Sequence, residues 1–119
     1  MSISVLAISF DTHNAAQLAQ LWAQALHRSV DHGASEDFAS IAADTDSGLG
    51  AVLMFHKVPE GKTVKNRVHL DLQAADVLAE ADRLIGLGAK QIRSLAENNN
   101  RWINFLDPDG NEFDLVASE

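Results

Sequence analysis

The chain has 119 residues, which is the size of one compact domain that buries its own apolar core without a disulfide or a structural metal. Its 17 Asp and Glu outnumber its 9 Lys and Arg, so the net charge is -8 with neutral histidine. This acidic excess argues against binding to nucleic acid or to an anionic membrane, and the lack of cysteine excludes thiol chemistry and a disulfide framework. No basic N-terminal region and no apolar run of roughly 18 residues is present, so we expect a cytoplasmic protein without a membrane span.

The first half of the chain predicts a strand, a helix and three more strands. Residues 3–10 are rich in β-branched and apolar side chains, which is typical of a strand. Asn14 is placed to cap a helix over residues 14–27, in which apolar residues recur at the spacing of one helix face. We expect three short antiparallel strands to follow, at residues 29–32, 38–44 and 51–58.

The second half repeats this order. Residues 66–72 predict a strand, and Asp76 opens a helix over residues 76–87 that ends at Gly88. Three further strands are expected at residues 90–95, 101–106 and 112–117. The chain is therefore predicted to be one α+β domain, residues 1–119, built from two tandem βαβββ modules at about residues 3–58 and 66–117, since neither half alone buries enough apolar surface.

Several segments resemble the vicinal-oxygen-chelate superfamily, which includes glyoxalase I, bleomycin-resistance proteins and extradiol dioxygenases. The segments RVHLDL, RLIGLGA and RWINFLDPDGNEFDL resemble the second module of these proteins, and LAQLWAQAL resembles their first helix. AVLMFHKVPEGK followed by KNRVHLDL is similar to the small bacterial glyoxalase-like domains. The resemblance implies that the curled sheets of the two modules enclose a cleft, and that the protein forms a homodimer.

The resemblance also implies a divalent metal, held by residues from four strands around the cleft. The corresponding positions are His69 and Asp114 in the second module, and Ala7 and Met54 in the first. The first pair are competent ligands, whereas the second pair are not, so the set is incomplete. His56 follows Met54 by two residues, about 6.6 Å along a regular strand, and would replace it only through a bulge or a different register. We therefore expect no metal cofactor, with a divalent metal as the alternative.

Strand alternation selects the candidate ligand-binding residues. His69 shares its face with Arg67 and Asp71, and Trp102 shares its face with Asn104. The plainer alternatives are exposure to solvent for Arg67 and Asp71, and core packing for Trp102. We predict that His69 and Asp114 act at the centre of the site, and that one cavity between the modules carries the ligand-binding residues Met54, His56, Arg67, Asp71, Trp102 and Asn104.

Three functions fit this pattern. The favoured one is binding of a small organic molecule in the cleft without a complete catalytic metal site, as the resemblance to bleomycin-resistance proteins implies. The second is a divalent-metal-dependent lyase, isomerase or dioxygenase acting on a substrate with neighbouring oxygens. The third is metal-free acid–base catalysis, with His69 as the base and Asp114 or Asp71 orienting it. Whether the protein is an enzyme, and which ligand it takes, stay open from the sequence.

Overall fold

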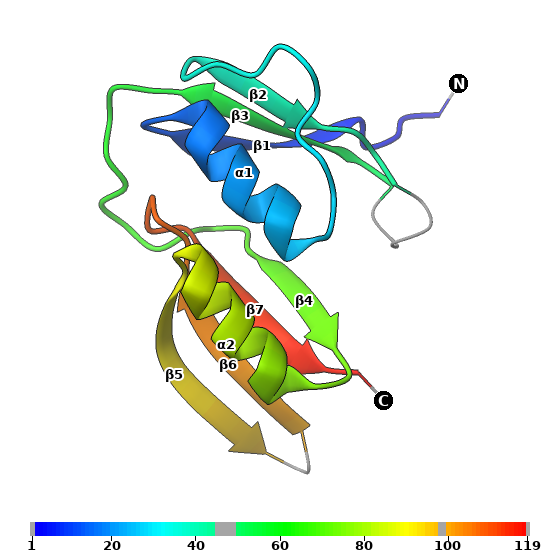
Figure 1. Ribbon diagram of the computed structural model, residues 1–119, viewed down its shortest axis with the longest axis vertical. Coiled ribbons are helices and arrows are strands. Elements are labelled where there is room, and N and C mark those ends of the chain that lie inside the picture. The colour runs from blue at the N-terminus through cyan, green and yellow to red at the C-terminus, as the bar shows by residue number, and fades with distance from the viewer. Residues whose placement is uncertain (1, 45–49, 98–99, 119) are drawn as a thin grey trace. The chain divides into compact units, whose positions relative to one another are not determined.

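Figure 1 shows the computed structural model, which describes residues 2–44, 50–97 and 100–118. The chain divides into two units, Met1–Gly61 and Lys62–Glu119, and each contains one sheet and one helix. This confirms the α+β class and the repeated order of elements. In chain order the elements are β1 (Ala7–Thr12), α1 (Ala15–Ala25), β2 (Phe38–Ile41), β3 (Val52–Lys57), β4 (Leu70–Ala74), α2 (Val77–Leu87), β5 (Lys90–Glu97), β6 (Asn100–Leu106) and β7 (Glu112–Ala117).

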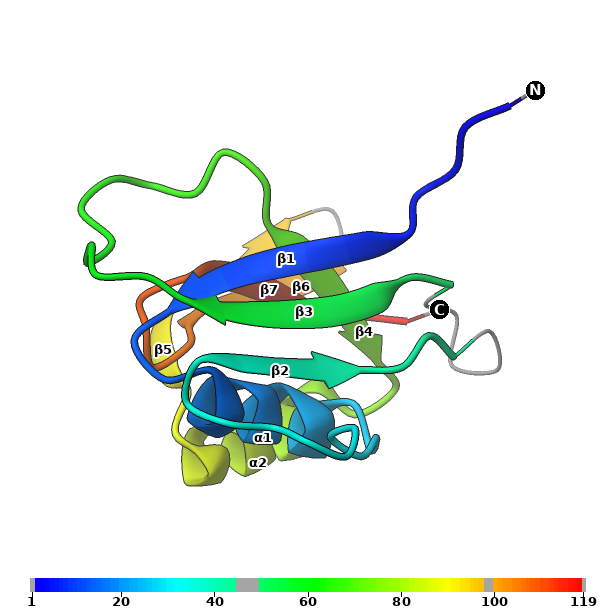
Figure 2. The same cartoon turned by 90° about the horizontal axis from the view of Figure 1, so that it is seen from above.

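The first unit is a three-stranded sheet in the order β1-β3-β2, seen side by side in Figure 2. β1 runs parallel to β3, and β2 runs antiparallel to it. The helix α1 packs on the sheet, where Leu18 and Trp22 are buried together with Phe55 of β3. The side chain of Asn14 accepts a hydrogen bond from Gln17 N at 3.2 Å, so this residue caps α1 as its position in the sequence predicts.

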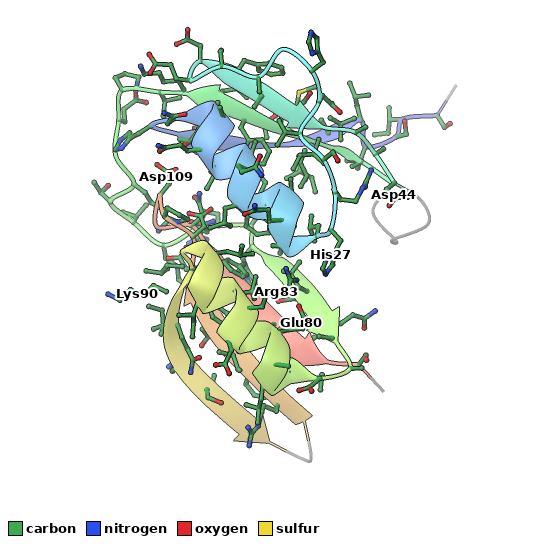
Figure 3. All side chains as sticks on the ribbon, in the orientation of Figure 1. His27, Asp44, Glu80, Arg83, Lys90 and Asp109 are labelled. Atoms are coloured by element: carbon green, nitrogen blue, oxygen red, sulfur yellow. The ribbon has the colours of Figure 1, made fainter. Side chains whose placement is uncertain are left out.

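The prediction of a strand at residues 29–32 is wrong, because this segment forms no regular strand. It lies beside β2 through the hydrogen bond from Asp31 N to Ser40 O, 2.8 Å long. The chain enters the segment through His27, labelled at the end of α1 in Figure 3, and leaves it through Gly33; their φ angles are 56° and 93°. These two left-handed residues bend the backbone on both sides, which leaves too little extended chain for a ladder.

The second unit is a four-stranded sheet in the order β4-β7-β6-β5, with β4 parallel to β7 and the other neighbours antiparallel. The expected helix and the three strands after it are all present, and β4 begins at Leu70 rather than at residue 66. Asp76 caps α2 at its start, and Gly88 ends it with a φ of 116°. Within α2, the partly buried side chain of Arg83 pairs with Glu80 at 2.7 Å (both labelled in Figure 3).

Each sheet has one face that is buried beneath its helix and one face that is not. In the second unit Phe105 and Phe113 stack with their ring centroids 5.4 Å apart, and both are buried together with Leu84 of α2. Because side chains alternate along a strand, the residues before and after each of these aromatics on its own strand point to the other face. This second face carries the polar side chains described next. No helix within the described residues is long and apolar enough to cross a membrane.

Candidate functional site

A line of polar residues crosses the second sheet on the face that α2 does not cover. The strand register places Asp71 of β4 opposite Asp114 of β7, Asp114 opposite Asn104 of β6, and Asn104 opposite Arg93 of β5. Arg93 reaches this line because the register of β5 shifts between Gln91 and Arg93, so one extra residue is inserted there. We call these four residues, Asp71, Asp114, Asn104 and Arg93, the polar row.

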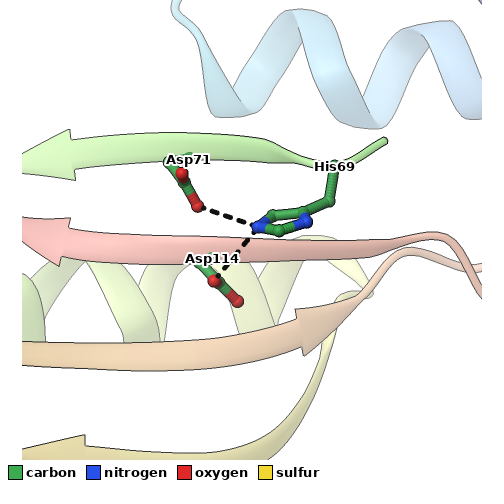
Figure 4. A group of neighbouring side chains, drawn as sticks. All are labelled: His69, Asp71 and Asp114. Atoms are coloured by element: carbon green, nitrogen blue, oxygen red, sulfur yellow. Dashed lines mark ion pairs between the residues drawn. The ribbon is translucent and has the colours of Figure 1, made fainter. Parts of the chain in front are cut away.

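His69 lies at one end of the polar row, immediately before β4. Its Nε2 is 3.3 Å from Oδ1 of Asp71 and 3.5 Å from Oδ2 of Asp114, and dashed lines mark these two ion pairs in Figure 4. The Asp114 side chain is 21% exposed and that of Asp71 is 60% exposed, so the imidazole lies between a partly buried and an open carboxylate. The structure therefore brings His69 and Asp114 together, and adds Asp71 to them.

Asn104 and Arg93 fix the orientation of the Asp114 carboxylate. Nδ2 of Asn104 donates to Oδ1 of Asp114, and Nε of Arg93 donates to Oδ1 of Asn104 at 2.8 Å. Because Arg93 has only donors, the Asn104 amide must turn its oxygen to Arg93 and its NH₂ group to Asp114. Oδ1 of Asp114 is thus occupied, and Oδ2 is the oxygen that faces His69.

Glu112 braces the segment that leads to His69. It lies on the same face of β7 as Asp114, and its carboxylate accepts hydrogen bonds from Nζ of Lys62 at 2.9 Å and from the backbone N–H of Asn66 at 2.8 Å. Burial raises the pKa of Glu112, but the Asn66 N–H and the Lys62 ammonium outweigh it and hold the pKa below its ordinary value. Lys62 is therefore paired with a carboxylate of β7.

Partly exposed apolar side chains surround the polar row. Trp102 and Leu106 lie on either side of Asn104 on β6, and Val116 follows Asp114 on β7. Their alternation with buried Ile103, Phe105 and Leu115 places them on the face of the polar row. Trp102 is therefore not a core residue of this sheet, and an indole plane lies on the face that carries the polar row.

The other predicted site residues lie away from this group or in the first unit. Arg67 is exposed and sits in a bend, where the alternation of a regular strand does not hold. Met54 and His56 lie on the face of β3 opposite to buried Leu53 and Phe55, and the His56 ring contacts that of Phe38 with centroids 5.1 Å apart. The predicted cavity between the modules stays a prediction.

The second unit has a donor set that fits a divalent metal. One ligand atom from each of His69, Asp71 and Asp114 lies within 4.8 Å of the other two. A metal at about 2.1 Å from each ligand needs the ligand atoms to be at most about 4.2 Å apart, so a small side-chain rotation closes the set. Imidazole and carboxylate are ligands for zinc, iron and manganese. The expectation of no metal rests on a missing third ligand, and Asp71 removes that argument.

The sequence predicts Asp71 as a ligand-binding residue but does not single it out as a candidate metal ligand. The signal was present, because Asp71 follows His69 by two residues. Its distance from Asp114, however, depends on the pairing of β4 with β7, which the sequence does not display.

The fold and this arrangement define a protein of the vicinal-oxygen-chelate superfamily. Residues 7–116 match the family model described as "Glyoxalase-like domain". Because the match spans nearly the whole chain, the chain belongs to the glyoxalase-like domain family. No curated protein matches the sequence significantly.

Solved structures show the same fold at low sequence identity. A glyoxalase/bleomycin resistance protein/dioxygenase family enzyme from Burkholderia phytofirmans PsJN has a TM-score of 0.73 at 16% identity, with 93% of this chain and 95% of that chain covered. A glyoxalase-related enzyme from Fulvimarina pelagi has a TM-score of 0.74 at 15% identity, with 97% and 88% covered. The bleomycin-binding protein of Streptomyces verticillus, complexed with copper(II)-bleomycin, has a TM-score of 0.63 at 15% identity, with 100% and 99% covered.

Proposed function

We propose that this protein binds a small organic molecule on the face of the second sheet that carries the polar row. The observation that carries the proposal is the placing of His69, Asp114 and Asn104 beside partly exposed Trp102. Oriented polar groups next to an apolar, flat side chain are the usual composition of a small-molecule site. The ligand is then amphipathic: its polar end contacts His69 and Asp114, and its apolar part lies on Trp102.

The likeness to the bleomycin-binding protein supports a binding role, since that protein holds a small molecule on the same fold. The first module supports it as well, because Ala7 and Met54 cannot complete the four-position metal set that the superfamily resemblance implies. We propose that Met54, His56, Arg67 and Asp71 contact the same ligand, and that the two modules act as one domain.

A metal-dependent enzyme is the second candidate, and the converging donors of His69, Asp71 and Asp114 favour it. A bound divalent ion would polarise the oxygens of a substrate, which is the chemistry that a lyase, isomerase or dioxygenase of this kind needs. In that role the three side chains hold the ion, and Asn104 keeps the Asp114 carboxylate in place.

The test of the binding role is a ligand screen with chelator-treated protein. Aromatic and dicarbonyl compounds are screened by thermal shift, and each hit is titrated calorimetrically into wild type, His69→Ala and the control His32→Ala, which removes an exposed histidine of the first unit. We expect the first variant to lose at least about tenfold in affinity, as loss of a hydrogen-bonding partner in a site does, and the control to bind like wild type. Equal affinity in all three proteins would remove His69 from the site.

We also propose a cytoplasmic homodimer. β1 and β4 are edge strands of their sheets, and the large apolar side chains of Ile3, Val5 and Leu6 before β1 are exposed. Pairing with a second copy would cover such edges. Light scattering at micromolar concentration tests this, and a mass of 12.9 kDa, that of one chain, would contradict it.

A further inference from the structure

We infer that the ligand of this protein carries an acidic group, a carboxylate or a phosphonate, and that the guanidinium of Arg93 binds this group. The inference rests on the proposed function, because it names a second polar group of the molecule that lies on Trp102. Arg93 belongs to β5, the outermost strand of the second sheet. It would thus both orient the Asn104 amide and select the ligand by charge.

The guanidinium of Arg93 has donors that the protein leaves for a ligand. Its Nε donates to Oδ1 of Asn104 at 2.8 Å, and none of the side chains that the structure describes forms an ion pair with it. The side chain is exposed, so a ligand can reach it. Because Nε is occupied, the fork that remains is the pair Nη1 and Nη2. This pair matches two oxygens of one carboxylate or phosphonate group.

An apolar row of side chains runs beside the polar row. Leu95 of β5 is opposite Trp102 of β6, and Trp102 is opposite Val116 of β7. We call these three partly exposed residues the apolar row. Each lies two positions along its strand from a member of the polar row, about 6.6 Å away on the same face. A flat ring that lies on Trp102 and Leu95 can therefore extend a substituent to Arg93.

The charges of the polar row determine which way round an acidic ligand lies. Its two carboxylates, Asp71 and Asp114, are on β4 and β7 beside His69, whereas its cation, Arg93, is on β5. An acidic group is repelled at the first end and attracted at the second, and the neutral Asn104 amide separates the two. The acid therefore lies over β5, and a neutral or hydrogen-bond-donating group of the ligand faces Asp114.

The experiment uses three probes that carry different groups on the same ring carbon: naphthoate, naphthylphosphonate and the neutral naphthamide. Protein labelled with ¹⁵N is titrated with each probe, and the indole N–H signals report where the probe binds. The chain has two tryptophans, and Trp22 is buried in the first unit, so its signal is the internal reference. The variant Trp102→Phe assigns the two signals.

The variants separate the charge of Arg93 from its part in orienting Asn104. Arg93→Gln removes the charge and keeps a hydrogen-bonding side chain, whereas Arg93→Lys keeps the charge and loses the fork. The matched control is Arg101→Gln. Arg101 is also exposed, but its place next to Trp102 on β6 directs it to the opposite face. The measured quantity is the affinity for each acid relative to the amide, because a variant that only displaces Asn104 weakens all three probes alike.

We expect wild type and Arg101→Gln to bind at least one of the two acids at least about fivefold more tightly than the amide, since a bidentate pair is at the strong end of exposed ion pairs. Arg93→Gln should bind acids and amide equally, and Arg93→Lys should lie between Arg93→Gln and wild type. The acid that binds more tightly identifies the group that the ligand carries. The inference is overturned if wild type binds all three probes alike, or if Arg93→Gln keeps the preference of wild type.

The inference and the proposed function can fail separately. If naphthoate, naphthylphosphonate and naphthamide shift the Trp102 signal with equal affinity, the binding face stands and this inference alone is overturned. If neither acid shifts that signal, the inference is overturned as well. The binding role is then judged by the ligand screen with dicarbonyl compounds and by His69→Ala, neither of which depends on an acidic group.

Discussion

The strands of the two modules pair in equivalent registers, but different residues occupy the paired positions. In the first module Ser9 of β1 is opposite Met54 of β3, and Met54 is opposite Ser40 of β2. Ser40 Oγ then donates to Oδ2 of Asp31 at 2.7 Å, in the segment beside β2. This line of residues has a single carboxylate, and it lies at the far end from Ser9.

In the second module the equivalent line is the polar row, from Asp71 through Asp114 and Asn104 to Arg93. The opposite faces of the two sheets remain alike, because each buries a phenylalanine of its central strand, Phe55 in one and Phe113 in the other. The comparison teaches that the face under the helix maintains the fold, while the other face is free to carry chemistry. Four predictions test this division.

The largest effect is expected from the buried faces. Phe113→Ala and Phe55→Ala should each lower the free energy of unfolding by about 3–5 kcal/mol, because each side chain is almost fully buried and leaves a cavity. His69→Ala, on the other face, should change it by less than about 0.5 kcal/mol. Urea unfolding followed by circular dichroism measures all three. If His69→Ala destabilises the protein as much as Phe113→Ala, the division between the faces is wrong.

The next effect separates the two lines of polar residues. Asn104→Ala should weaken metal binding by about 10- to 100-fold, because Asp114 loses the group that orients it. Ser40→Ala alters the equivalent position of the first module and should leave metal binding unchanged. Calorimetry with Zn²⁺ gives both affinities. A purely structural role for Asn104 would instead lower the melting temperature of the metal-free variant.

The helix ends provide a smaller contrast. α2 ends at Gly88 with a φ of 116°, whereas α1 is followed by His27 with a φ of 56°. Gly88→Ala should cost about 1 kcal/mol of stability, since a side chain is strained in this conformation. His27→Gly should relieve strain and be neutral or slightly stabilising. Thermal unfolding of both variants decides this, and stabilisation by Gly88→Ala would contradict the assignment.

The smallest effect concerns the Glu112 brace, which has no counterpart in the first module because Val52 occupies the equivalent position. The pKa of Glu112 is lowered in the folded protein, so its contribution to stability is present above the ordinary carboxyl pKa. That contribution is lost as the pH falls through the lowered value. Glu112→Gln should therefore be about 0.5 kcal/mol less stable at neutral pH, and the difference should shrink in acid. A constant difference at every pH would show that charge is not its cause.

The sequence predicts the second module better than the first. Every expected element between Asp76 and residue 117 is present, because the capping residues Asp76 and Gly88 and the alternation along the strands agree there. The strand expected at residues 29–32 is absent because the backbone bends at His27, which has a left-handed conformation. The sequence does not indicate this bend, because histidine is not a residue type that signals a left-handed backbone. Gly33, by contrast, is a visible signal of a turn.

Part of the candidate site could also be predicted. Alternation placed His69 on the face of Asp71, and the resemblance paired His69 with Asp114; the structure brings the three together. The part played by Arg93 could not be foreseen, because regular alternation along β5 would direct it toward α2. Only the inserted residue, Ile92, reverses its direction.

This single inserted residue has a genetic consequence. Loss of the Ile92 codon would make the pairing of β5 regular while leaving Gln91 opposite Phe105 and Arg93 opposite Asn104, so the guanidinium would keep its hydrogen bond to Asn104. β5 is the outermost strand, so the sheet could absorb the change without disturbing β6 or β7. A one-codon deletion at this position would thus remove the bulge from the sheet edge and spare the chain of contacts from Arg93 through Asn104 to the Asp114 carboxylate. Relatives of this chain can therefore gain or lose the bulge in one mutational step while the polar row keeps its arginine.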